Sequence, residues 1–186
     1  MLLILDFWPG EYSKTFVFAN RNHESVIEAL RAGHVFVTTG DLVSELYVEV
    51  TMGNQSASIG EEIRIPGGSE VNVTIKVLDP DLPNAAGENP LVKRVDLIAG
   101  EVRGEVSDPE TNSNESTRVV KRFSSSDWAK DGKYLVMSQR LPVGGSHYIR
   151  IRGTNTNELE PEKDPPAENP FTDLWFYSNP IFVTVD

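Results

Sequence analysis

Val71-Asn-Val-Thr-Ile-Lys-Val77 is the stretch that decides the fold class, because its apolar side chains recur at every second residue. Alternation with a period of two places the apolar side chains of a β-strand on one face of a sheet and the polar ones on the other. Leu46, Val48 and Val50 repeat the pattern earlier in the chain. The sequence therefore predicts sheets with one face in a core and one face in solvent.

Other short runs rich in β-branched and aromatic residues predict further strands, separated by turn signals such as Pro66-Gly67-Gly68. Their ranges are 34–39, 57–65, 91–99, 117–124, 133–140, 147–152, 173–177 and 181–185. Because no helix is predicted between these strands, we expect an all-β fold, an antiparallel immunoglobulin-like β-sandwich. A barrel fits less well, since the predicted loops are long and uneven.

One helix is predicted near the N-terminus, over residues 22–33. Asn22 is a good N-cap, and Gly33 suits the left-handed position that ends a helix. Val26, Ile27 and Leu30 follow the helical period and form one apolar stripe. A lone helix of this length is marginal in water, so we expect the stripe to pack on the sandwich or on a second chain. An exposed stripe would mean that it faces another domain.

Composition excludes several classes of function. The chain has 186 residues, no cysteine, 17 Lys+Arg and 28 Asp+Glu, which gives a net charge of −11. This acidity argues against nucleic acid and anionic membranes as partners. The apolar run at residues 1–5 is too short for a signal peptide or a membrane helix and predicts a short strand. Without cysteine, the chain has no disulfides, zinc ribbons or thiol chemistry.

Three stretches together resemble one enzyme family. They are Glu11-Tyr-Ser-Lys-Thr-Phe-Val-Phe-Ala19, Ser25-Val-Ile-Glu-Ala-Leu-Arg-Ala-Gly-His-Val-Phe-Val-Thr-Thr-Gly40 and Tyr177-Ser-Asn-Pro-Ile-Phe-Val-Thr-Val185. This pattern is similar to the C-terminal part of PHP-type (polymerase and histidinol phosphatase) metallohydrolases of the CehA/McbA-like branch. The middle stretch, which combines "E-A-L-R-A-G" with "V-x-x-T-x-G", is the most specific, and residues 41–175 carry no matching motif.

The resemblance implies two domains and a partner. Residues 1–40 would be the last strand and helix of a PHP-like barrel, and residues 41–186 an accessory β-sandwich. In the family, the metal ligands lie in the barrel, in "H-x-H" and "D-x-H" motifs that this chain lacks. We therefore expect no catalytic residue and no cofactor in this chain. Manganese, zinc or iron is expected only in an upstream catalytic barrel, which would be the partner.

These considerations predict a non-catalytic C-terminal accessory β-sandwich domain of a PHP-like metal-dependent phosphoesterase. The alternative is a binding module for carbohydrate or calcium. Trp175 and Tyr177 alternate with Leu174 and Phe176, so they share a strand face. If that face is exposed, the two rings form a flat platform suited to a sugar. Packing of both rings against a neighbouring segment is the competing interpretation.

Calcium is considered because two loops are rich in the hard oxygen ligands that it prefers. The first loop offers Asp79, Asp81 and Glu88, with Asn84 between them. The second adds the carboxylates Glu158, Glu160, Glu162, Asp164, Glu168 and Asp173. The spacing does not match an EF-hand, and a solvated acidic surface explains the same residues. The three histidines, His23, His34 and His147, are too scattered in the sequence to predict a metal cage.

Overall fold

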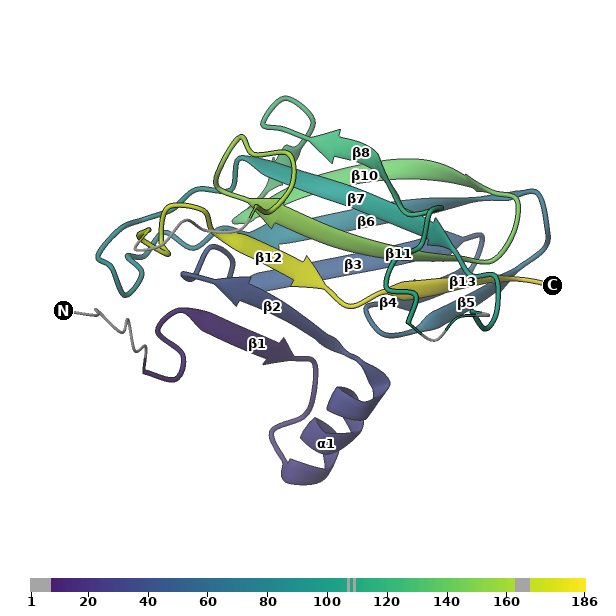
Figure 1. Cartoon of the computed structure of the whole chain (residues 1–186), viewed down its shortest axis with the longest axis horizontal. Coiled ribbons are helices and arrows are strands. Elements are labelled where there is room, and N and C mark those ends of the chain that lie inside the picture. The colour runs from purple at the N-terminus through teal and green to yellow at the C-terminus, as the bar shows by residue number, and fades with distance from the viewer. Residues whose placement is uncertain (1–7, 107, 109, 163–167) are drawn as a thin grey trace.

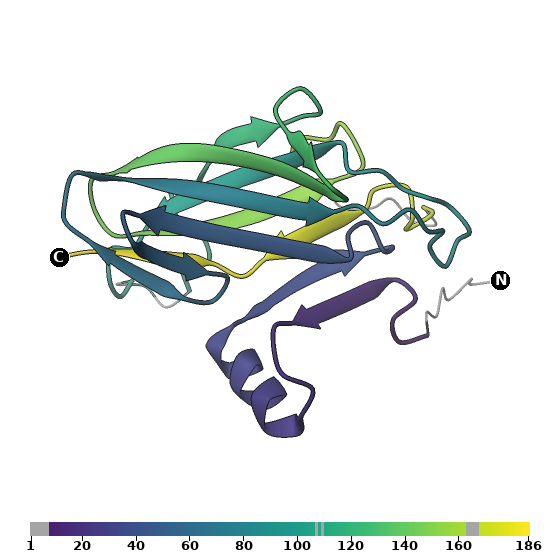
Figure 2. The same cartoon turned by 180° about the vertical axis from the view of Figure 1, so that it is seen from behind.

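The structure is a computed structural model that describes residues 8–106, 108, 110–162 and 168–186. Two β-sheets lie face to face, and the helix extends away from them at one edge (Figures 1 and 2). The predicted all-β sandwich with a short N-terminal strand–helix segment is therefore confirmed. The strand predicted at residues 1–5 lies outside the described residues.

The sheet that faces the viewer in Figure 1, here the front sheet, has eight strands. Its path runs β1-β2-β12-β11-β13-β5, while β7 pairs with the other edge of β11 and carries β8. The bounds are β1 Ser13–Val17, β2 Val35–Thr39, β5 Glu62–Ile65, β7 Arg94–Glu101, β8 Arg118–Phe123, β11 His147–Thr154, β12 Trp175–Ser178 and β13 Ile181–Val185.

The back sheet has five strands in the order β4-β3-β6-β10-β9. Its bounds are β3 Glu45–Met52, β4 Gln55–Ser58, β6 Ser69–Leu78, β9 Ala129–Asp131 and β10 Tyr134–Val143. The strand of the opening motif, β6, lies in the middle of this sheet. The four apolar side chains of the motif are fully buried. They face a core completed from the front sheet by residues such as Leu97, Ile151 and Phe176. The alternation of period two is thus the pattern that builds the core.

One range that was predicted as a single strand is interrupted. The run at 57–65 is two strands, β4 in the back sheet and β5 in the front sheet. Gly60 lies between them with a φ of +88°, and a Cβ atom there would come within 2.6 Å of the His34 ring. The chain therefore turns and changes sheet at a position that only glycine accepts. β5 also pairs in parallel with β13, an exception in otherwise antiparallel sheets.

The N-terminal strands belong to the front sheet. β1 pairs with β2, and β2 pairs with β12 with Phe36 opposite Ser178. Residues on both sides of position 40 therefore share one sheet with the end of the chain. The predicted division into 1–40 and 41–186 remains a prediction, because this pairing is compatible with a barrel segment docked along a sheet edge.

Candidate functional site

Helix α1, His23–Ala32, has the capped ends that the sequence predicts. The Asn22 side chain accepts a hydrogen bond from the Ser25 backbone N–H at 2.9 Å. Gly33 adopts a φ of +78°, and its N–H bonds back to carbonyls of the last turn. These caps satisfy backbone groups that would otherwise be unpaired at the ends of a short helix. Local sequence therefore determines where α1 begins and ends.

The C-terminal end of α1 is fixed to the front sheet by hydrogen bonds. The Asn179 side chain donates to the Gly33 carbonyl at 3.0 Å, and the Asn179 backbone N–H donates to Val35 at 3.1 Å. The Phe18 N–H donates to the His34 carbonyl at 2.9 Å. Two chain segments thus hold the helix end, and the orientation of its faces is set by the sheet.

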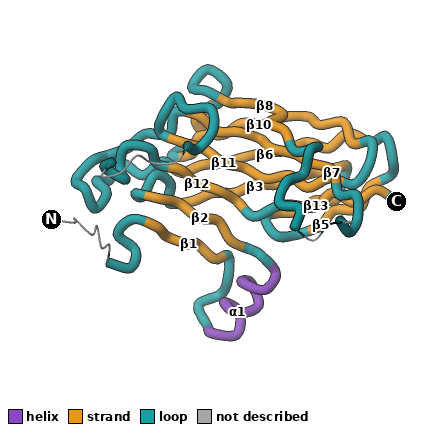
Figure 3. The backbone as a smooth tube through the Cα atoms, viewed as in Figure 1, coloured by secondary structure: helices purple, strands orange, loops and turns teal. Residues whose placement is uncertain are grey.

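The apolar stripe of α1 is exposed. Ile27 and Leu30 are 48% and 50% exposed, and Val26 is only partly buried. Ala29 is the residue of α1 that is buried. Figure 3 shows the helix standing apart from both sheets. The expectation that the stripe packs on the sandwich was therefore wrong, because the small face of the helix points toward the strands and the large apolar face points away. We call Val26, Ile27 and Leu30 the α1 stripe.

In the second candidate surface, the aromatic pair of β12, Trp175 is buried and Tyr177 is half-buried. Trp175 is 5% exposed, and the guanidinium carbons of Arg94 and Arg152 lie 5.8 and 5.6 Å from its ring centre. The ring of Tyr177 stacks beside it, with centroids 6.2 Å apart. A sugar platform requires two exposed rings. Trp175 does not meet this requirement, because two arginines occupy the space over its ring.

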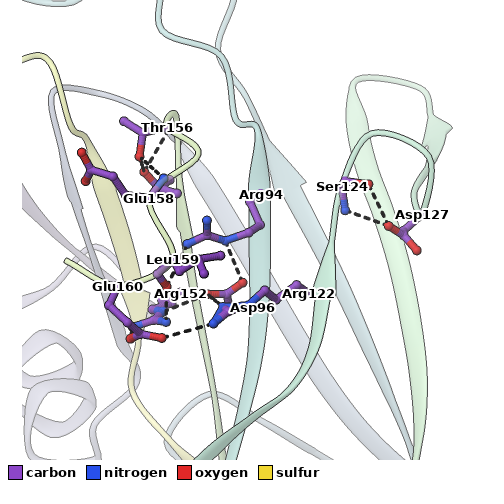
Figure 4. A network of polar contacts seen from close by, with 11 residues as sticks. Arg94, Asp96, Arg122, Ser124, Asp127, Arg152, Thr156, Glu158, Leu159 and Glu160 are labelled. Atoms are coloured by element: carbon purple, nitrogen blue, oxygen red, sulfur yellow. Dashed lines mark hydrogen bonds and ion pairs between the residues drawn. The ribbon is translucent and has the colours of Figure 1, made fainter.

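The two arginines belong to a buried network on the outer face of the front sheet (Figure 4). Asp96 is fully buried and accepts hydrogen bonds from Arg94 at 2.9 Å, Arg152 at 3.0 Å and Arg122 at 3.2 Å. Glu160 accepts two more, from Arg152 at 2.6 Å and Arg122 at 3.2 Å. Because a buried charge is costly unless it is paired, Asp96 and its partners hold one another in place.

The same network fastens the loop that follows β11. The Leu159 carbonyl accepts hydrogen bonds from Arg94 and Arg152, at 3.3 and 3.0 Å. The hydrogen bond from Arg152 lowers the pKa of the Glu160 carboxyl, although partial burial opposes this effect. Glu160 is therefore charged at neutral pH and forms ion pairs with Arg152 and Arg122. Glu160, one of the carboxylates of the second acidic loop, thus helps to anchor its own loop.

The network was not predicted from the sequence, although a signal for it exists. Arg94 and Asp96 are two residues apart in one strand, and Arg150 and Arg152 in another, at positions where charged residues are costly. Alternating charges of opposite sign in neighbouring strands predict ion pairs across a sheet. Their pairing depends on β7 lying next to β11, which residue spacing does not reveal.

The first predicted calcium loop is organised by its own hydrogen bonds. Asp79 accepts from the Val92 N–H at 2.9 Å, and Asp81 accepts from the Asn89 side chain at 3.1 Å. Asn84 is buried, and its carbonyl oxygen accepts from two loop N–H groups. Glu88 is exposed. Burial raises the pKa of Asp79, although the Val92 hydrogen bond opposes this rise.

Metal ligands do not gather in the part of the chain that the structure describes. Within it, no group of three or more His, Asp or Glu side chains is arranged to hold a metal ion. Asp164 lies outside the described residues. The calcium site proposed for Asp79, Asp81 and Glu88 therefore stays a prediction. Of the histidines, His23 is exposed at the start of α1, and the His147 ring contacts the Gly145 carbonyl.

Comparisons with known proteins add no relative. A scan against protein-family models and searches of curated proteins and of solved structures found no significant match. Within the described residues, no helix is both long and apolar enough to cross a membrane. A function must therefore be inferred from the residues and the geometry of this chain.

Proposed function

We propose that this chain is the non-catalytic accessory β-sandwich domain of a PHP-like metal-dependent phosphoesterase. Its role is to dock on the catalytic barrel of the parent protein and to stabilise it or shape access to its active site. The observation that carries this proposal is the exposed α1 stripe. It lies on a helix whose capped ends and orientation are well defined, so the stripe is a formed surface that lacks a partner among the described residues.

Two independent observations coincide on this helix. The stretch Ser25–Gly40, which carries the most specific part of the family resemblance, contains most of α1 and all of β2. The same stretch contains Ile27 and Leu30, the half-exposed apolar residues. In the family, this segment belongs to the barrel. The rest of that barrel, seated on the α1 stripe, would remove these side chains from water, which is favourable for association.

The partner proposed for the α1 stripe is a metal-dependent barrel. Its chemistry would be supplied by the barrel, where bound metal lowers the pKa of water for attack on a phosphoester. This chain would contribute surface and rigidity. We therefore expect the chain alone to hydrolyse no aryl phosphate above background with manganese, zinc or iron.

The test begins with the native reading frame upstream of Met1. The proposal expects it to encode a barrel with H-x-H and D-x-H motifs, and the longer polypeptide to hydrolyse an aryl phosphate in a chelator-sensitive way. In that polypeptide, Ile27→Lys with Leu30→Lys should lower the melting temperature. Leu91→Lys, at an apolar residue that is 62% exposed in a distant loop, is the matched control and should have no effect.

Three results would overturn the proposal. The first is an upstream sequence without the metal-ligand motifs. The second is a longer enzyme whose stability and activity respond equally to the stripe variants and to Leu91→Lys. Chelator-sensitive turnover by the chain alone would also contradict it, because the sequence of this chain contains neither metal-ligand motif.

A further inference from the structure

A cavity of about 390 Å³ lies between the back sheet and the start of β2. Buried Val48 and Ile59 contribute to its lining, and the side chains of Phe18, Tyr47 and Glu49 also line it. Its volume falls within the range of roughly 300–1,000 Å³ that is typical of small-molecule sites. The cavity is distinct from the α1 stripe and from the arginine network, since its lining residues belong to neither.

Two aromatic rings form one side of the cavity. Phe18, just after β1, and Tyr47, on β3, have ring centres 5.9 Å apart and planes inclined by 50°. Tyr47 is 46% exposed, although its hydroxyl donates to Glu45 at 3.0 Å, which fixes the ring. The faces of such rings carry negative electrostatic potential and attract cations. This side therefore offers both apolar surface and affinity for positive charge.

Two carboxylates line the cavity close to Ser58. Glu49 is the cross-strand neighbour of Ser58 in the β3–β4 pair. Glu61 accepts hydrogen bonds from the Ser58 N–H at 2.7 Å and from its hydroxyl at 2.8 Å. These bonds lower the pKa of Glu61, so its charge is retained at neutral pH.

The basic groups of the lining compensate only part of this negative charge. Lys76 lines the cavity, but its ammonium group lies 3.4 Å from the Asp131 carboxylate on β9. His34 is the other basic group of the lining and also exerts a favourable charge interaction on Glu61. The lining of the cavity thus combines aromatic rings, buried apolar residues and two carboxylates.

We propose that this cavity binds a small organic cation, an alkylammonium or guanidinium group attached to an aromatic or apolar body. The charged group would lie near Glu49 and Glu61, and the apolar body against Phe18 and Tyr47. The net charge of −11 favours the approach of cations from solution. This inference does not depend on the proposed docking of a barrel, because the cavity is present in the chain alone.

Three probes of similar shape and different charge test the proposal: phenethylammonium, neutral phenethyl alcohol and anionic hydrocinnamate. Each is titrated into the isotopically labelled chain and followed by NMR. We expect phenethylammonium to bind most tightly and to shift signals of Phe18, Tyr47 and Glu49. Added salt should weaken only the binding of the cation, because screening acts on its charge. Equal affinity for the three probes, or shifts located elsewhere, would overturn the proposal.

Variants separate the two contributions. Glu49→Gln should weaken phenethylammonium binding roughly fivefold and leave phenethyl alcohol unchanged. Tyr47→Leu should lower the affinity for phenethylammonium about five- to tenfold. Glu70→Gln, which removes an exposed carboxylate from the same sheet outside the cavity, is the charge-matched control and should change binding little. If Glu70→Gln lowers the affinity for phenethylammonium as much as Glu49→Gln does, the cation is attracted only by the overall charge of the protein. The proposed site is then refuted.

Discussion

Replacement of Asp96 by asparagine tests whether the buried network holds the front sheet together. The substitution preserves the size of the side chain and removes one negative charge from a residue with no exposed surface. Asparagine retains one acceptor oxygen, but its amide group presents hydrogen atoms to guanidinium groups that can only donate. Arg122 and Arg152 would then keep Glu160 as their carboxylate partner. Arg94 would keep its hydrogen bond to the Leu159 carbonyl.

The size of the effect follows from the number of bonds lost and from burial. Asp96 accepts three charge-assisted hydrogen bonds, from Arg94, Arg122 and Arg152. The carboxylate's own desolvation cost is recovered on substitution, so the three bond energies do not simply add. Removing one partner from a buried ion pair costs about 3–5 kcal/mol, and we expect a loss in this range. For a chain of this length, that corresponds to a decrease in melting temperature of roughly 6–20 °C.

Urea denaturation followed by tryptophan fluorescence measures this loss, since Trp175 packs beneath Arg94 and Arg152. Asp81→Asn is the matched control: the same change at an exposed carboxylate should stay within about 0.5 kcal/mol of the parent. If Asp96→Asn does not fold, Arg122→Leu removes only one of the three donors and should cost about 1.5–3 kcal/mol. A loss below about 1 kcal/mol in both variants would refute this reasoning.

The remaining predictions concern the helix and two carboxylates. Leu30→Ala should change the unfolding free energy of this chain by less than about 0.5 kcal/mol, because Leu30 is half exposed; a loss above about 2 kcal/mol in urea would show that the stripe is buried. Burial raises the pKa of Asp79, so its ionisation destabilises the fold as pH rises through that raised value. Asp79→Asn should therefore raise the melting temperature at neutral pH but not at about pH 3, and equal shifts at both would contradict this. At neutral pH, millimolar calcium should leave the melting curves of the parent chain and of Asp79→Asn unchanged. The pKa of Glu160 is lowered, so its stabilising effect is present above its unfolded value and is lost as pH falls through the folded one. Glu160→Gln should reduce this loss in acid, and an unaltered pH profile would exclude the contribution of Glu160.

Local patterns predicted the elements of this fold well. The alternation of Val71–Val77 predicted β6, and the caps Asn22 and Gly33 predicted the ends of α1. Both signals are local, since a strand face and a helix cap are formed by residues close in sequence. The range 181–185 likewise matches β13. Three-residue β9 was missed, because its exposed residues carry no apolar alternation.

The exposure of a side chain depends on residues distant in sequence and could not be predicted. The exposure of Trp175 is decided by Arg94 and Arg152, which come from β7 and β11. The period-two pattern correctly placed Trp175 and Tyr177 on one face, but it contains no information about what lies above that face. The α1 stripe is the reverse case. Its spacing predicted a buried face, but the sheet leaves these side chains exposed.

The pairing of β2 with β12 has a consequence for the order in which the chain folds during synthesis. The strands of the back sheet are all complete once residue 143 has been made, and their pairings need nothing that follows. The N-terminal strands β1 and β2 are made before the other described strands, but they have no partner in the rest of the front sheet until residues 175–178 emerge. They therefore keep an unpaired edge until β12 has been made, and unpaired strand edges are prone to aggregation. A nascent chain released before Trp175 would expose β2 and β11 together, and such a product would be a substrate for chaperones or proteases.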